Sequence, residues 1–207
     1  MAANLLSSVT ETSCLVNILH EILVSRWTKK KPCIAVCPSQ YLEKYVGFDV
    51  ALPGFNKILA LQFKAYRHQQ GKVLDYFSVY GKQHNTLLSY PRNCAFYVFP
   101  DYKTHQKMDQ DRRQEFQGSS YLILNNTWFV ETHSIPKKAK RIYRDHLASG
   151  VIPSFTWRKL ESELSRCQFG FRIVRIGEYY VLHDPEEREV EVLSIPSGRF
   201  SLFYTTI

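Results

Sequence analysis

The sequence predicts an α/β protein with a β-rich C-terminal region, and three observations lead to this class. Apolar residues recur at three- and four-residue spacing in residues 10–27, as on one face of a helix. Short apolar runs bounded by turn-forming residues follow, as in strands. With 207 residues, of which 44% are hydrophobic and 14% aromatic, the chain is long enough to bury a core.

The first half of the chain mixes predicted helices and strands. Leu15, Ile18 and Ile22 mark the apolar face of the first helix. A second helix begins at Ser39, whose hydroxyl can cap free backbone N–H groups, and ends at Gly47. The elements that follow are strands at residues 48–52, 58–66 and 73–80, a helix at 82–90, a strand at 94–99 and a polar helix at 104–117.

The second half is predicted to be richer in strands. Two runs of β-forming residues lie at 121–124 and 128–131, and a helix is expected around residues 157–167. The tail predicts an antiparallel meander with runs at 171–183, 188–194 and 199–206. We therefore expect an N-terminal helix and an α/β core in residues 1–118, and an accessory β-rich region with one helix, packed on that core, in residues 119–207.

Charge and cysteine content limit the partners and the compartment. The formal net charge is +8 at pH 7, which favours a polyanionic partner such as nucleic acid. No apolar run approaches the length that spans a bilayer, so we expect no membrane partner. The cysteines lack the paired spacing of a disulfide framework or a zinc site, which predicts reduced thiols in the cytoplasm; they stand at positions 14, 33, 37, 94 and 167.

Polar residues interrupt two of the predicted strands. Gln62 and Lys64 share one face of their strand, because side chains alternate and apolar residues occupy positions 59, 61 and 63. If residues 48–52 pair with this strand through the turn at Pro53 and Gly54, Asp49 lies opposite Gln62 or Lys64. An acid, an amide and an ammonium group are then expected to converge.

Such a group of side chains suits hydrolysis of a phosphodiester bond. Asp49 offers a hard anionic oxygen to Mg²⁺, which needs few protein ligands, and Gln62 can add a neutral oxygen. Lys64 can orient or deprotonate the attacking water and neutralise charge on the phosphate. Glu43, on the helix before the Asp49 strand, can reach the same ion directly or through water.

The segments GFD and LALQFKAY resemble the PD-(D/E)xK nuclease superfamily, in particular its Mrr-type branch, in which glutamine replaces the acid of the triplet. The resemblance covers residues 39–99 and implies a restriction-endonuclease-like αβββαβ core, with a mixed central sheet flanked by helices. It implies a Mg²⁺- or Mn²⁺-dependent endonuclease that cuts DNA, with a role in restriction or defence. Asp49, Gln62 and Glu43 match the metal ligands, and Lys64 matches the catalytic lysine. The chain departs from the pattern in having no proline directly before Asp49.

Two further groups could contact nucleic acid. Gln83 and His84 lie one turn before the apolar residues of the helix at 82–90, near a helix N-terminus that favours phosphate. They are candidates for supporting the site or contacting phosphate, although a capping glutamine and a core histidine explain them equally well. A basic segment could follow a phosphate backbone or form a solvated surface; its residues are Lys137, Lys138, Lys140, Arg141 and Arg144.

Other interpretations of the sequence stay open. Gln62 and Lys64 could occupy the solvent face of an edge strand, with Asp49 as a surface acid. The chain could be a catalytically inactive subunit with the nuclease fold that binds nucleic acid or a protein, because glutamine is a weaker metal ligand than a carboxylate. It could also be an interaction module whose C-terminal meander pairs with a partner. A homodimer or a larger complex is compatible with each interpretation.

Overall fold

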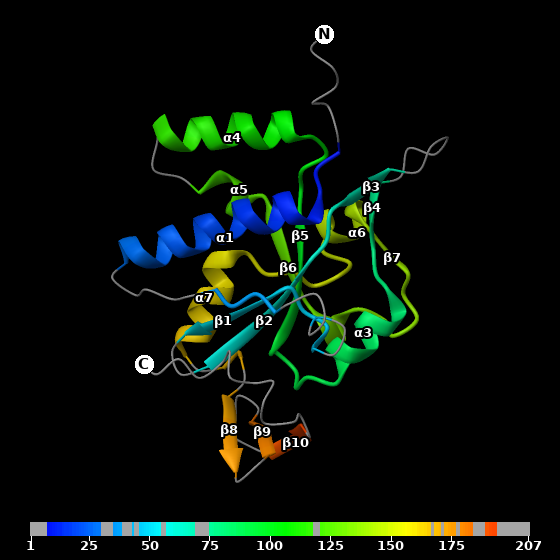
Figure 1. Cartoon of the computed structure of the whole chain (residues 1–207). Coiled ribbons are helices and arrows are strands. Elements are labelled where there is room, and N and C mark those ends of the chain that lie inside the picture. Colours follow the sequence, from blue (N-terminus) through cyan, green and yellow to red (C-terminus); the bar gives the residue numbers. More distant parts are fainter. Residues whose placement is uncertain are drawn as a thin grey trace.

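A computed structural model shows how these segments fold (Figure 1). It describes residues 8–29, 35–38, 43, 46–54, 57–68, 75–117, 121–166, 168–170, 172–176, 179–183 and 189–193. Most of the predicted second helix lies outside these ranges, although its residues Glu43 and Val46 are helical. None of the described helices is both long and apolar enough to cross a bilayer.

A mixed sheet forms the centre of the fold. Its strands stand in the order β1 (Val50–Gly54), β2 (Lys57–Phe63), β5 (Ala95–Pro100) and β6 (Thr127–Glu131). Strand β2 runs parallel to β5, whereas β1 and β6 are antiparallel to their neighbours. The carboxyl ends of β2 and β5 therefore meet at one edge of the sheet. This arrangement confirms the predicted α/β class with a mixed sheet flanked by helices.

Helices cover one face of the central sheet (Figure 1). Helices α1 (Glu11–Thr28) and α7 (Trp157–Ser165) contact the strands, whereas α5 (Leu122–Asn125) packs beside α1, and α4 (His105–Gln117) packs on α5. Ile18 of α1 and Leu160 of α7 are fully buried in one core with Phe63 of β2. Thr10 caps α1 by accepting a hydrogen bond from the Ser13 backbone N–H at 3.1 Å.

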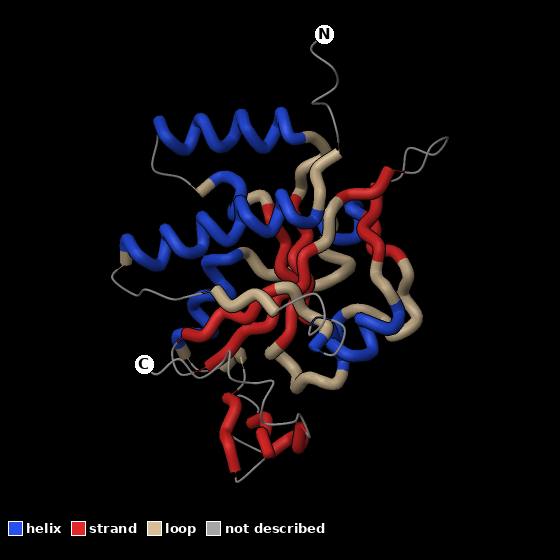
Figure 2. The backbone as a smooth tube through the Cα atoms, viewed as in Figure 1, coloured by secondary structure: helices blue, strands red, loops and turns tan. Residues whose placement is uncertain are grey.

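A second core lies on the opposite face of the sheet. It is closed by α3 (Gly81–Leu88), α6 (Arg144–Ala148) and a small antiparallel sheet of β3 (Tyr66–His68), β4 (Asp75–Ser78) and β7 (Arg141–Tyr143). A short 3₁₀ helix, η1 (Thr132–Ser134), follows β6. Leu87, Phe77 and Ile142 belong to the same core as Ala60 and Tyr97 of the central sheet. Figure 2 shows the strands between helices on both sides.

One predicted strand is divided between two sheets. The strand expected at residues 58–66 ends as β2 at Phe63, and Tyr66 pairs with Phe77 in the small sheet. The backbone N–H of Lys64 still donates to the Val98 carbonyl at 3.0 Å, so the change of sheet follows directly after Lys64. The strand expected at 73–80 appears as β4 and belongs to the small sheet rather than to the central one.

The prediction of a strand at residues 121–124 is wrong, because residues 122–125 form the short helix α5. Two carboxylates bind free N–H groups of this helix. Ile123 donates to Glu115 Oε1 at 2.9 Å, and Leu124 donates to Glu21 Oε2 at 2.7 Å. Burial raises the pKa of Glu21 to about 8, and a hydrogen bond with Glu115 adds to the rise. These tertiary contacts override the β propensity of the segment.

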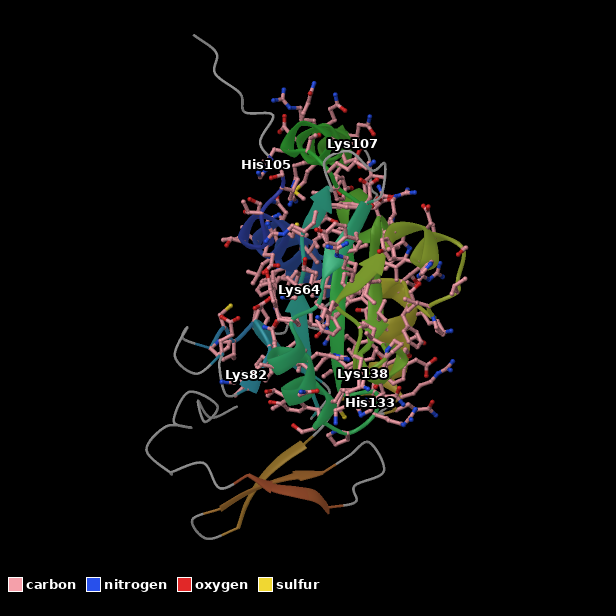
Figure 3. The ribbon with its side chains drawn as sticks, turned by 90° about the vertical axis from the view of Figure 1, so that its right-hand side faces the viewer. Lys64, Lys82, His105, Lys107, His133 and Lys138 are labelled. Carbon is pink, nitrogen blue, oxygen red and sulfur yellow. The ribbon has the colours of Figure 1, made fainter. Side chains whose placement is uncertain are left out.

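Part of the predicted meander lies at one end of the molecule, below the central sheet in Figures 1 and 3. It consists of β8 (Arg172–Ile176), β9 (Tyr179–His183) and β10 (Glu189–Leu193), paired antiparallel in the order β10, β9, β8. The last predicted run, residues 199–206, lies outside the described residues. Strands β6 and β7 come from the expected accessory region and join the two sheets of the N-terminal region.

Gly47 follows the second helix and brings the chain close to α3. Its φ of +74° lies in the left-handed region that favours glycine. A Cβ atom at this position would lie 3.0 Å from Thr86 Cγ2 and 3.4 Å from the Gln83 carbonyl oxygen. Gly47 therefore allows the segment that carries Glu43 and Asp49 to pack directly on α3.

We predict that Gly47→Ala destabilises the protein by about 2 kcal/mol, since it combines left-handed strain with a close contact on Thr86. Gly150→Ala is the matched control, because Gly150 has a φ of +76° but nothing within 4 Å of the added Cβ. Gly150→Ala should destabilise the protein by only about 1 kcal/mol, because it introduces the left-handed strain without the close contact. Urea unfolding measures both values, and equal losses would show that the contact with α3 is not tight.

Candidate active site

The predicted residues meet where β2 leaves the central sheet. Val50 pairs with Leu61, and the Asp49 backbone N–H donates to the Leu61 carbonyl at 3.0 Å, so Asp49 lies next to Gln62 as expected. The Gln62 side chain points toward α3, whose residue Gln83 it contacts. The first turns of α1 and α3 both reach this position, because Glu11 and Gln83 contact Lys64.

A continuous chain of hydrogen bonds joins Lys64 to Asp49. Lys64 Nζ donates to Gln83 Oε1 at 3.0 Å, and Gln83 Nε2 donates to Gln62 Oε1 at 2.7 Å. Gln62 Nε2 then donates to Asp49 Oδ2 at 2.8 Å. The same Asp49 oxygen accepts the Phe63 backbone N–H at 2.7 Å. We call the side chains of Lys64, Gln83, Gln62 and Asp49 the amide relay.

The two strand residues of the relay are buried, which contradicts the interpretation of a solvated edge strand, whereas Asp49 and Gln83 are half-buried. Gln62 and Lys64 are each only 1% exposed. The ammonium group of Lys64 has two further contacts: it lies 3.7 Å from Glu11 Oε1 and 5.3 Å from the centre of the Tyr80 ring. The Glu11 side chain is 39% exposed and Tyr80 is 53% exposed, so the site reaches the surface on this side.

The electrostatics of Asp49 are those of an acid whose charge is incompletely compensated. Burial raises its pKa from the usual 3.8 to about 7. The Phe63 N–H, the charge of Lys64 and the Gln62 amide lower the pKa in part. The Glu43 carboxylate adds to the rise. A cation bound beside Asp49 would stabilise the charged form, so this environment favours cation binding.

The donor set can hold a divalent cation after one rearrangement. Asp49 and Glu43 interact electrostatically, and one or two carboxylates with water suffice for Mg²⁺. Gln62, however, turns its NH₂ group rather than its oxygen toward Asp49. Rotation about the last bond of the Gln62 side chain exchanges these two atoms. Among the residues that the structure describes, no three His, Cys, Asp or Glu side chains form a metal-binding group.

Of the two supporting candidates, only Gln83 joins the relay. His84 is fully buried, and its Nδ1 lies 3.3 Å from the Tyr97 hydroxyl. Burial lowers the pKa of His84, which favours a neutral ring. A buried neutral histidine does not reach a phosphate in this conformation. His84 instead supports Tyr97, which is the neighbour of Gln62 on β5.

The predicted basic segment lies apart from the relay. Figure 3 shows Lys138 well below Lys64, nearer the lower end of the molecule. Lys137, Lys138 and Lys140 are exposed, which permits contact with a phosphate backbone. The two arginines have partners within the protein. Arg144 donates hydrogen bonds to both Asp101 oxygens, at 2.9 and 2.7 Å, and Arg141 lies 4.7 Å from the centre of the Tyr76 ring.

Three neighbours of the relay were not predicted from the sequence. Glu11 comes from the first turn of α1, and no spacing in the sequence links it to Lys64. Tyr80 directly precedes α3, and Tyr97 lies on β5. The alternation of side chains on β5 could have indicated Tyr97, because it places residues 95, 97 and 99 on one face. The sequence does not predict that β2 pairs with β5, which is the pairing that places Gln62 beside Tyr97.

We predict that Lys64→Met raises the pKa of Asp49 above about 7, because the ammonium group that favours the carboxylate is removed. Glu43→Gln should lower the pKa, since it removes a like charge. Carbon-13 NMR titration of the aspartate carboxyl groups measures both shifts. Lys159→Met is the control, because Lys159 is an exposed residue of α7. An Asp49 pKa that does not respond to Lys64→Met would contradict the shared site.

Comparison with known proteins identifies no relative of this chain. No protein-family model matches this chain, and no curated protein or solved structure matches it significantly. The proposed function therefore depends on the residues of the site and on their geometry.

Proposed function

We propose that this protein is a metal-dependent nuclease that hydrolyses phosphodiester bonds of DNA, with a restriction-endonuclease-like core and a role in restriction or defence. The observation that carries the proposal is the convergence of Asp49, Gln62 and Lys64 at the end of β2. These residues were expected to meet because of side-chain alternation and the pairing of their strands, and they resemble the D…QxK pattern. The arrangement of carboxylate, amide and ammonium supports that expectation.

In this proposal Asp49, Glu43 and Gln62 hold Mg²⁺ or Mn²⁺, which supplies Lewis acidity and an activated water when bound. Lys64 donates hydrogen bonds from Nζ to a phosphate oxygen, and so offsets the negative charge that builds up during attack. The first turns of α1 and α3 add the positive ends of two helix dipoles on the side of Lys64. Glu11 Oε1 lies 3.7 Å from Lys64 Nζ and comes from the more exposed side of the site.

Exposed lysines near the site can bind the rest of the substrate. Lys82 lies in the first turn of α3, and Figure 3 shows it between Lys64 and the lower end of the molecule. Lys137, Lys138 and Lys140 form a basic loop that can contact the phosphate backbone further along. Contacts of this kind carry little sequence information, so they suit a DNA substrate without defining a recognition sequence.

A second candidate function follows from the orientation of Gln62. Its NH₂ group already satisfies the Asp49 carboxylate, which stabilises the site without a metal. This observation favours a catalytically inactive subunit that keeps the nuclease fold and binds nucleic acid or a protein partner. Metal-dependent cleavage distinguishes the two functions.

We predict that the purified protein cuts plasmid or single-stranded DNA in the presence of Mg²⁺ or Mn²⁺ and not in the presence of a chelator. Lys64→Met should reduce the cleavage rate by about 100-fold or more, because it removes a donor that stabilises the transition state. Lys159→Met serves as the control and should keep the wild-type rate. Melting curves confirm that both variants fold.

Binding of DNA without cleavage by the wild-type protein, under every metal condition, would contradict the nuclease and support the inactive subunit. Cleavage of RNA but not of DNA would keep the chemistry and correct the substrate. Equal cleavage by the wild-type protein and Lys64→Met would remove Lys64 from catalysis.

A further inference from the structure

The amide relay has a direction that its two ends impose. An ammonium group can only donate hydrogen bonds, and a carboxylate can only accept them. Lys64 therefore requires an oxygen from Gln83, and Asp49 in its charged form requires an NH₂ group from Gln62. The contact between the two amides, Gln83 Nε2 to Gln62 Oε1 at 2.7 Å, satisfies both requirements only in this orientation. Neither amide can reverse alone without placing two donors or two acceptors together.

Burial makes such a mismatch costly. Gln62 is 1% exposed, and its NH₂ group uses its second hydrogen on the Phe63 carbonyl at 3.2 Å. At the Gln62 end of the pair a lost partner leaves an unsatisfied buried donor or acceptor, which costs the solvation of that group, whereas Gln83 is half-buried. The two amides are thus expected to turn together or not at all.

A cation at Asp49 demands the opposite orientation. Metal ions such as Mg²⁺ bind oxygen, so Gln62 must turn Oε1 to the place where Nε2 now stands. Its NH₂ group then faces Gln83, which must present Oε1 to Gln62. The NH₂ group of Gln83 would in turn face the ammonium group of Lys64, and this pair of donors cannot bond.

The structure offers Lys64 another partner. Glu11 Oε1 lies 3.7 Å from Lys64 Nζ, and the exposed Tyr80 ring lies 5.3 Å from the same nitrogen. Lys64 can therefore leave Gln83 without losing charge compensation. Movement toward Glu11 brings the ammonium group closer to the open side of the site, where a phosphate would approach.

We propose that Gln83 opposes cation binding at Asp49 through the orientation it imposes on Gln62, and that a bound cation transfers Lys64 from Gln83 to Glu11. This inference rests on the proposed metal site and adds a regulatory step to it. The lysine is withdrawn from the substrate side while the site is empty of metal, and it becomes available when the metal binds.

The alternative is that Gln83 simply supports Gln62 as a metal ligand, and the two roles predict opposite signs. If Gln83 opposes the cation, its removal tightens metal binding, because Gln62 is then free to turn its oxygen toward Asp49. If Gln83 supports Gln62, its removal weakens metal binding. Gln83→Leu distinguishes them, since it removes both polar groups and leaves the net charge unchanged.

The test is a calorimetric titration of the full chain with Mn²⁺ alone. We expect Gln83→Leu to bind Mn²⁺ about tenfold more tightly than the wild-type protein, the equivalent of one hydrogen bond. Gln62→Leu should bind at least about tenfold more weakly. Gln110→Leu, at an exposed glutamine of α4, should match the wild-type protein. Gln83→Met provides a second variant, because it also removes both polar groups without changing the net charge, keeps an unbranched side chain, and should also tighten binding.

A spectroscopic measurement tests the reversal itself. Nitrogen-15 NMR should show that Mg²⁺ shifts the side-chain amide signals of both Gln62 and Gln83 in the wild-type protein. In Gln62→Leu, Mg²⁺ should leave the Gln83 amide signal unchanged, because the relay is interrupted. A shift confined to Gln62 in the wild-type protein would overturn the coupled reversal.

The outcomes separate this inference from the function on which it rests. Mn²⁺ binding by the wild-type protein with equal or weaker binding by Gln83→Leu overturns the role of Gln83 and leaves the metal site intact. Failure of both proteins to bind Mn²⁺ overturns the inference, and failure of both to cut DNA overturns the proposed nuclease as well. Tighter binding by Gln83→Leu supports the metal site and the role of Gln83 together.

Discussion

The buried charge of Lys64 is the constraint on which the rest of the site depends. A lysine that is 1% exposed requires compensation, because moving an ammonium group out of water costs several kcal/mol. The protein provides this compensation both directly and at a distance. Two glutamines carry hydrogen bonds from Lys64 to Asp49, and Glu11 contacts the ammonium group from α1. Removal of any member leaves another buried polar group without its partner.

The fold explains how these distant residues meet. The antiparallel pairing of β1 and β2 places Asp49 beside Gln62, and the end of β2 places Lys64 between the first turns of α1 and α3. Gly47 allows the preceding segment to pack against α3, because a side chain at this position would make a tight contact with Thr86. The central sheet thus fixes one half of the site, and the helices on its two faces complete the other half.

Much of this arrangement could be predicted from the sequence, because it follows from local patterns. Alternation along residues 58–64 correctly separates Gln62 from the apolar side chains of Leu61 and Phe63, and the predicted strand pairing correctly places Asp49. The predicted turn is wrong, because Pro53 and Gly54 belong to β1 and pair with Ile58 and Lys57. Tertiary contacts determine the rest. Glu21 and Glu115 hold residues 122–125 as a helix where propensity favours a strand. The contact of Glu11 with Lys64 depends on how α1 packs on the sheet, which no spacing in the sequence reveals.

Coupling between Lys64 and Asp49 through the buried relay is tested most directly by a double-mutant cycle with Lys64→Met and Asp49→Asn. Urea unfolding at pH 8, above the Asp49 pKa of about 7, gives the free energies. We expect a coupling of about 1–2 kcal/mol that shrinks at pH 5, where Asp49 is protonated and its charge is lost. The account would be contradicted if, at pH 8, the loss of unfolding free energy in the double mutant equals the sum of the losses in the two single mutants to within about 0.3 kcal/mol.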